Sequence, residues 1–342
     1  MIARWTVYVR SAVTARQASA VAVFLAALAI APLVANDFQL SVLGLVFLHS
    51  LVGMAWNLMM GYAGQLSLGH ALYFGIGAYI VAILSERYGI TPWIGMPVAF
   101  VVSALIGFAV GALGFRFGLR GVYFALLTIA FAEFARIVFE HWGFVGGTAG
   151  YFFGALTAKN QPLISLRGNA TFFYYALLVS LVLFWLLSLL SVKSRLGYFW
   201  RAVREDEEAA RALGVDAFRV KLAAVALSGG MTGVAGGWFA LVNGALFPDT
   251  VLGMRLSIDF ILAPIVGDLG TLFGPIIGAF IIVPLAEIAK ELGQASGMNG
   301  LNLLIYGLLL GVVVLVAPNG CWPWIAKKLG VSDDSFGEGG RQ

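Results

Sequence analysis

Long apolar runs separated by short polar stretches repeat along almost all of this 342-residue chain. Two of the clearest are ASAVAVFLAALAIAPLVA near the N-terminus and TFFYYALLVSLVLFWLLSLLS in the middle. A membrane-crossing helix needs about 20 mostly apolar residues, whereas a membrane β-barrel shows short segments of alternating hydrophobicity. The pattern therefore predicts an all-α, polytopic membrane protein with about ten spans, some broken by Gly or Pro. Eight spans would fit if two short Gly/Pro-broken segments were re-entrant. We expect them near residues 18–36, 40–60, 68–85, 93–115, 121–139, 171–191, 222–242, 257–274, 276–292 and 301–317.

Composition excludes a soluble globular protein. Hydrophobic residues make up 61% of the chain and charged residues only 11%, against about 25% charged in soluble domains. The single cysteine, Cys321, excludes an internal disulfide framework and a cysteine-rich metal site. Basic residues beside apolar spans are explained by membrane orientation, so the pI of about 9.2 needs no nucleic-acid partner.

The basic residues indicate the orientation of the chain. Most of the 21 Lys and Arg lie in segments that are cytoplasmic if both termini are inside, as the positive-inside rule requires. We expect the first apolar run to be a retained span, because it is long for a signal peptide and no small-x-small cleavage site follows it. One transmembrane domain then covers 1–330, with an external loop at 143–170, an internal loop at 192–221 and a disordered polar tail at 331–342.

Glycines recur at every fourth residue in the C-terminal half. Such faces let helices approach closely in lipid, and we expect packing to be their main role. The three sets are Gly229, Gly233 and Gly237; Gly270, Gly274 and Gly278; and Gly307 and Gly311.

One sequence imitates an ATPase signature. Leu227 to Met231 read LSGGM, but they lie inside an apolar span, and the chain has no G-x-x-x-x-G-K-[ST] to hold phosphates. We therefore expect no ATP hydrolysis and no cofactor in this chain itself.

Residues 61–79, GYAGQLSLGHALYFGIGAY, combine five glycines with polar side chains. Together with Asn57, the residues Gln65, Ser67 and His70 indicate a broken membrane helix. Such breaks are tolerated where protein buries them or water reaches them, and they often mark transport pathways. These four residues are candidates for a translocation pathway, and packing between subunits is the rival explanation.

Ionisable residues inside spans are costly and usually face a bundle interior. Glu133 with Arg136 and Glu287 with Lys290 are spaced to neutralise each other along a helix. His49 fits an ordinary core histidine.

Asp259 and Asp268 lack an obvious local partner, and we regard them as candidates for a gate or an interface. A membrane-embedded enzyme would need a convergent cluster of chemical groups. Three histidines scattered at 49, 70 and 141 do not supply one.

The most charged stretch is SRLGYFWRAVREDEEAARALGVDAFRVK, in the internal loop. We expect one helix from Trp200 to Leu213, with Gly214 ending it. Its apolar stripe consists of Phe199, Val203, Ala210 and Leu213. It is either a solvated surface helix or a docking helix for a cytoplasmic partner, and spacing alone leaves both open.

This loop carries a recognisable motif. Glu208-Ala209-Ala210, three residues and Gly214 resemble the EAA-x-x-x-G coupling loop of bacterial ABC importer permeases, although the downstream I-x-L-P element is missing. The blocks NLMMGYAGQLSLGHALYFGIGAY, RGVYFALLTIAFAEFARIVF and SIDFILAPIVGDLGTLFGPIIGA resemble the branch with the LivH/LivM branched-chain amino acid permeases. One departure is Asp268, where that branch usually has a glycine.

The resemblance implies a LivM-type permease subunit in the bacterial cytoplasmic (inner) membrane. Its implied partners are a second, LivH-type permease, two cytoplasmic ATPases that bind ATP and Mg, and an extracytoplasmic solute-binding protein. The implied substrates are branched-chain or other hydrophobic amino acids, with urea, amides or small aromatic acids as an alternative. A secondary transporter or channel driven by an ion gradient is the alternative of another class. The implied coupling residues are Arg204, Glu207, Glu208, Ala209, Ala210, Arg211 and Gly214.

Overall fold

The structure is a computed structural model that describes residues 15–153, 166, 168–295, 301–317 and 320–329. Six helical segments in this part are long and apolar enough to cross a membrane: Asp37–Tyr62, Pro92–Arg116, Val122–His141, Ala170–Lys193, Ala217–Asn243 and Pro248–Gly267. This confirms a polytopic helical membrane protein. The tail at 331–342 lies outside the described residues, as does part of the loop at 143–170.

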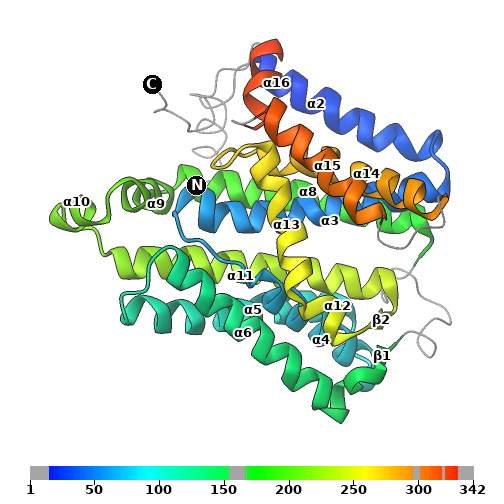
Figure 1. The fold of residues 1–342 in the computed structure, drawn as a ribbon, viewed down its shortest axis with the longest axis horizontal. Coiled ribbons are helices and arrows are strands. Elements are labelled where there is room, and N and C mark those ends of the chain that lie inside the picture. Colours follow the sequence, from blue (N-terminus) through cyan, green and yellow to red (C-terminus); the bar gives the residue numbers. More distant parts are fainter. Residues whose placement is uncertain (1–14, 154–165, 167, 296–300, 318–319, 330–342) are drawn as a thin grey trace.

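Helices account for nearly all of the described chain (Figure 1). The longer ones are α2 (Ala15–Ile30), α3 (Asp37–Asn57), α4 (His70–Tyr88), α5 (Pro92–Arg116), α6 (Val122–His141), α8 (Ala170–Lys193), α9 (Arg195–Glu205), α11 (Ala217–Asn243), α13 (Met254–Gly267), α14 (Gly274–Ala295) and α15 (Leu301–Val316). The short ones are η1 (Ala31–Leu33), the π-helix η2 (Leu58–Tyr62), η3 (Gly143–Val145), η4 (Gly147–Ala149), α10 (Glu207–Ala212), α12 (Pro248–Leu252) and α16 (Trp322–Leu329).

Helix α11 lies at the centre of one half of the bundle, against α4 and α5. A Cβ added to Gly77 would lie 2.0 Å from the carbonyl oxygen of Gly233, and one added to Gly236 would lie 1.9 Å from that of Phe74. The backbones of α4 and α11 therefore touch, as expected for small-residue packing in lipid. The LSGGM sequence lies within this packed helix, where no nucleotide could reach it.

The other two glycine sets behave differently from each other. Gly274 and Gly278 pack against the carbonyl groups of Asp268 and Ala263, but Gly270 lies in the turn before α14, with φ of 81°. The expectation of one helical face through Gly270 is wrong, because the helix begins only at Gly274. Gly307 and Gly311 on α15 have no described atom within 4 Å of an added Cβ, so they do not pack within the described chain.

The two ends of the bundle are distinct. Figure 1 shows α9 and α10 at one end of the long axis and the strands β1 (Tyr151–Phe152) and β2 (Ala245–Leu246) at the other. The strands pair antiparallel and join the loop after α6 to the loop after α11. The two loops predicted from the sequence thus lie at opposite ends, in so far as their residues are described.

An ion-pair cluster connects α6 to α12 at the strand end. Arg136 pairs with Glu133, as predicted, and also with Glu140. Asp249 of α12 lies 3.7 Å from the same guanidinium group. The cost of a charged side chain in a span is therefore offset by a local network.

Candidate functional site

The charged loop folds into two short helices rather than the single one predicted. Helix α9 ends at Glu205 and α10 begins at Glu207, with Asp206 between them in an extended conformation. The Asp206 carboxylate accepts hydrogen bonds from the backbone N–H groups of Glu208 and Ala209, both at 2.9 Å. An N-cap of this kind favours a new helix start, which explains the bend.

Burial divides the loop into an inner and an outer face. Val203 and Ala210 are buried in the core of the chain, whereas Glu208 and Ala209 are exposed. Leu213 is 87% exposed, so it does not belong to the predicted apolar stripe. Of the two alanines in the motif, only Ala209 is available to a partner.

Gly214 ends α10 with φ of 87°, as the sequence predicts. The exposure of Leu213, directly before Gly214, is not predictable from the sequence, because an apolar residue in an amphipathic helix is expected on its buried face. Leu213 forms an apolar tip at the outer end of the loop.

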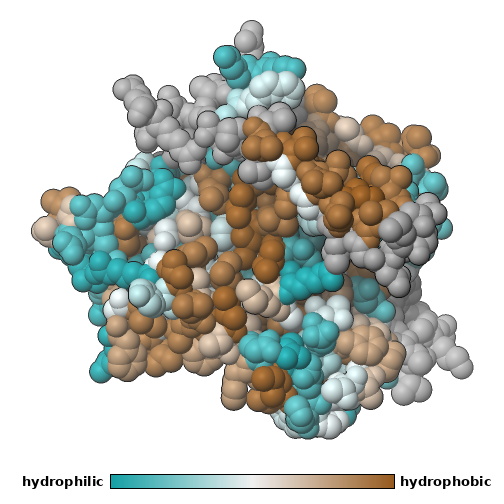
Figure 2. Space-filling view, in the orientation of Figure 1, coloured by the Kyte–Doolittle hydropathy of each residue, from teal (hydrophilic) through white to brown (hydrophobic). Residues whose placement is uncertain are grey.

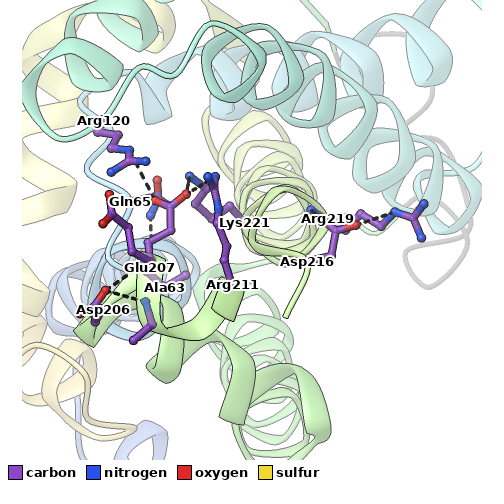
Figure 3. Close-up of polar contacts among 11 residues, drawn as sticks. Ala63, Gln65, Arg120, Asp206, Glu207, Arg211, Asp216, Arg219 and Lys221 are labelled. Carbon is purple, nitrogen blue, oxygen red and sulfur yellow. Dashed lines mark hydrogen bonds and ion pairs between the residues drawn. The ribbon is translucent and has the colours of Figure 1, made fainter. Parts of the chain in front are cut away.

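Glu207 is the most constrained residue of the loop (Figure 3). Its carboxylate lies 3.0 Å from Lys221 Nζ, 2.5 Å from Arg211 Nη2 and 3.6 Å from Arg120 Nε. The side chains of Lys221 and Glu207 are only 4% and 13% exposed. This carboxylate points into the bundle, unlike that of Glu208, and joins α10 to α11 and to the loop after α5.

Lys221 is a functional candidate that sequence reasoning missed. Its ammonium group also lies 4.6 Å from the ring centroid of Phe115, a favourable cation–π position. Lys221 lies 14 residues after Glu207, too far for a pair on one helix, so the sequence does not predict this contact. The bend at Asp206 brings the two side chains together. Removing one partner of a buried ion pair costs about 3–5 kcal/mol where the other charge is left uncompensated, so this pair is a strong link between α10 and α11.

A second link runs from the loop to the break in the early membrane helix. The guanidinium group of Arg204 donates a hydrogen bond to the carbonyl oxygen of Gly61, in η2. One turn earlier, Asn57 accepts a hydrogen bond from Gly270 N–H and donates one to the Thr271 carbonyl, both at 2.8 Å. The loop, the end of α3 and the turn between α13 and α14 therefore form one hydrogen-bonded chain.

The predicted break itself is confirmed: no helix is present between η2 and the start of α4 at His70. Ser67 Oγ lies 3.1 Å from His70 Nδ1, and His70 Nε2 lies 2.9 Å from Ser228 Oγ on α11. Ser67 and His70 are fully buried, while Gln65 is partly exposed and donates to the Ala63 carbonyl. The broken segment is thus held by side-chain bonds to neighbouring helices.

The two candidate carboxylates are nine residues apart, Asp259 in the first half of α13 and Asp268 directly after its last residue. Asp259 faces a pocket near the start of the helix, and Asp268 ends the helix next to Gly270. The structure does not bring them into one site. Among the described residues, no group of three His, Cys, Asp or Glu could hold a metal ion.

Asp268 has φ of 127° and ψ of 126°, a region that only glycine adopts without strain. It is 6% exposed, and its carbonyl oxygen accepts a hydrogen bond from the Thr271 hydroxyl at 3.0 Å. The glycine usual in similar permeases at this position would fit the same turn without the penalty.

We predict that Asp268→Gly stabilises the protein by about 1 kcal/mol, because relief of 1–3 kcal/mol of backbone strain exceeds the added chain entropy of glycine. Thermal unfolding of the purified chain in detergent measures this. Asp37→Gly, in the first turn of α3, is the matched control and should destabilise. A lower melting temperature for Asp268→Gly than for the parent would contradict the strain assignment.

Apolar helices packed around α11, with one charged loop joined to their end by ion pairs, define a polytopic helical membrane protein. A family model described as branched-chain amino acid transport system / permease component matches residues 38–317. The chain belongs to this family.

Curated relatives agree with the assignment. The chain is 30% identical over 322 residues to the Escherichia coli high-affinity branched-chain amino acid transport system permease protein LivM, covering 87% of this chain and 73% of that one. The Salmonella typhimurium LivM protein is 29% identical over 327 residues with the same coverage. A probable LivH permease of Methanocaldococcus jannaschii is 27% identical over 279 residues, covering 80% of this chain and 87% of that one. No solved structure matches this chain significantly.

Proposed function

We propose that this chain is the LivM-type membrane subunit of an ATP-driven importer that moves branched-chain or other hydrophobic amino acids into the cytoplasm. The observation that carries the proposal is the coupling loop. Glu207 anchors α10 to the bundle, while Glu208, Ala209 and Leu213 are exposed at the end of the molecule. A loop with one fixed face and one free face can transmit the movement of a partner to the helices.

The partners follow from the same assignment. A LivH-type permease completes the membrane pathway, two ATPases bind ATP and Mg and contact α10, and a solute-binding protein delivers the amino acid at the opposite end. ATP hydrolysis occurs in the ATPases. The loop's movement reaches α11 through Lys221 and reaches α3 and the α13–α14 turn through Arg204.

We propose that the chain has ten spans, with both termini in the cytoplasm of a bacterial inner membrane. A helix lies at each of the ten ranges expected from the apolar runs. The positive-inside rule then places α9 and α10 inside and the β1–β2 pair outside.

The docking face gives a direct test of function. The Glu208 side chain makes no ion pair or hydrogen bond within the described chain. Glu208→Arg should therefore leave folding intact and lower binding-protein-stimulated ATPase activity of the assembled complex at least tenfold. Swapping both charges, with Arg211→Glu added, should abolish it; because this second change also removes the ion pair between Arg211 and Glu207, Glu208→Arg alone tests the docking face. The control is Arg219→Glu, whose side chain is 84% exposed outside α10, and unchanged stimulation in Glu208→Arg would refute the docking role.

We further propose that Asn57, Gln65, Ser67 and His70 border the translocation pathway at the helix break. Gln65 is the partly exposed member, and His70 belongs to the buried network with Ser67 and Ser228. Gln65→Ala should reduce uptake several-fold with normal assembly of the complex. His70→Ala removes the side-chain partner of the buried Ser228 hydroxyl and one of the partners of Ser67. A buried group left unpaired costs about 1–3 kcal/mol, and we expect reduced uptake as well. Loss of assembly before loss of uptake in both variants would favour the packing explanation.

A further inference from the structure

A pocket of about 250 Å³ lies between α3, α13, α14 and α15. This volume is slightly below the range of pockets for drug-sized ligands, about 300–1,000 Å³, and it suits a smaller molecule. Figure 2 shows hydrophilic surface in the middle of the face that carries α13 and α15, bordered by hydrophobic side chains. Charged groups concentrated inside a span indicate a functional site by default.

Two pairs of opposite charges line the pocket. Lys290 Nζ and Glu287 Oε2 are 3.2 Å apart, as predicted from their spacing. Arg255 and Asp259 are one turn apart on α13, yet within the described part of the chain neither side chain forms an ion pair or a hydrogen bond. Within the described residues, one cation and one anion therefore face the same cavity without a directly contacting partner, and they lie near enough for their charges to interact. Charged groups of this kind are expensive to leave unpaired in a membrane.

The opposite part of the lining is aliphatic. Leu45 of α3 and Ile282 and Val283 of α14 contribute branched side chains without polar atoms. The pocket thus combines a cation, an anion and a branched apolar wall. An α-amino acid with an aliphatic side chain presents the complementary set: a carboxylate, an ammonium group and a branched apolar chain.

His49 contributes a further polar atom. Its Nδ1–H donates to the Leu45 carbonyl at 2.9 Å, because a carbonyl oxygen can only accept. In the neutral ring the other nitrogen, Nε2, is then an acceptor. An acceptor of this kind suits an ammonium donor rather than a second carboxylate.

The pocket lies well away from the coupling loop. Helix α14 begins at the turn that contacts Asn57, and Glu287 follows Gly274 by thirteen residues. At 1.5 Å per residue the separation along α14 is about 20 Å. On the proposed topology this places the charged groups toward the external side, where the solute is delivered.

We propose that this pocket is a substrate site in which Arg255 binds the carboxylate and Asp259 the ammonium group of an aliphatic α-amino acid, with its side chain against Leu45, Ile282 and Val283. The inference rests on the proposed function and adds to it a binding site within this chain. Urea and simple amides lack both charges, and aromatic acids lack the ammonium group. Each of them would therefore leave Asp259, or both Asp259 and Arg255, without an oppositely charged partner in the ligand.

The first test needs no variant. The complex of this chain with its partner permease and ATPases, in nanodiscs without the binding protein, is titrated with leucine, 4-methylpentanoate and isopentylamine while its melting temperature is followed. A ligand that binds only the folded state raises that temperature. Leucine should do so at a concentration at least tenfold lower than either analogue, which lacks one charge. Equal shifts for the three compounds would overturn the proposal.

The second test uses charge-preserving and charge-removing variants in the same complex. Arg255→Gln and Asp259→Asn should raise the half-saturating leucine concentration at least tenfold, while Arg255→Lys should restore most of the affinity. Asp37→Asn, exposed at the start of α3, is the control and should behave as the parent. The parent complex could import leucine while Arg255→Gln and Asp259→Asn also bind and import it normally. That result would refute the pocket assignment and leave the proposed function intact. If the parent complex imports no leucine, the proposed function itself fails.

Discussion

Replacing Gly61 with alanine should stop ATP-driven transport by the assembled complex. A Cβ at this position would lie 2.0 Å from Asn57 Oδ1 and 2.6 Å from the backbone nitrogen of Gly270. The methyl group would separate these two atoms, which are hydrogen-bonded at 2.8 Å, and would displace the carbonyl that Arg204 binds. Leaving such buried groups unpaired costs about 1–3 kcal/mol each.

The measurement is uptake by proteoliposomes, together with ATPase activity with and without the binding protein. In Gly61→Ala we expect uptake at least tenfold lower and stimulation lost, with basal ATPase activity retained. Gly307→Ala is the matched control, because its added Cβ meets no described atom and alanine is the better helix former. Normal uptake in Gly61→Ala would show that the link from the loop through η2 to the α13–α14 turn is not used.

Replacing Lys221 with methionine should have a comparably large effect. The Glu207 carboxylate would lose its most buried partner and keep Arg211 and Arg120, which lie on its exposed side. Breaking a buried ion pair costs about 3–5 kcal/mol where the remaining charge is left uncompensated. Because Arg211 and Arg120 still compensate the Glu207 carboxylate, we expect a smaller loss of stability, located at the contact between α10 and α11. We expect a clearly lower melting temperature and loss of stimulated ATPase activity.

A second substitution separates stability from coupling. Replacing both partners of a buried pair by apolar residues of similar size is often neutral or stabilising. Glu207→Leu combined with Lys221→Met should therefore recover most of the stability lost in Lys221→Met. Arg219→Met, which removes an exposed pair with Asp216, should cost less than about 1 kcal/mol. If Lys221→Met unfolds no more easily than Arg219→Met, the buried pair does not hold the loop.

The apolar runs predicted the helices well, because a bilayer demands a length and a composition that few other structures need. The break before His70 was also predictable, since glycines and polar side chains have no other reason to gather within a span. Spacing along one helix likewise identified the pairs Glu133–Arg136 and Glu287–Lys290.

Contacts between distant segments were not predictable from the sequence. Glu207 stands in a run of four acidic residues, and only the bend at Asp206 decides that Glu207 faces Lys221 while Glu208 faces outward. In the same way, the period of Gly270, Gly274 and Gly278 suggested one face, although the chain turns between the first two. Periodicity identifies a face only where the helix is continuous.

The central claim is tested most directly by leucine uptake into proteoliposomes that contain this chain with its LivH-type permease and both ATPases. ATP is supplied on the ATPase side and leucine-loaded binding protein on the other, with no ion gradient across the membrane. We predict that leucine accumulates only when both ATP and the binding protein are present. Accumulation driven by a proton or sodium gradient without ATP, or import of urea or an aromatic acid in place of leucine, would contradict the account.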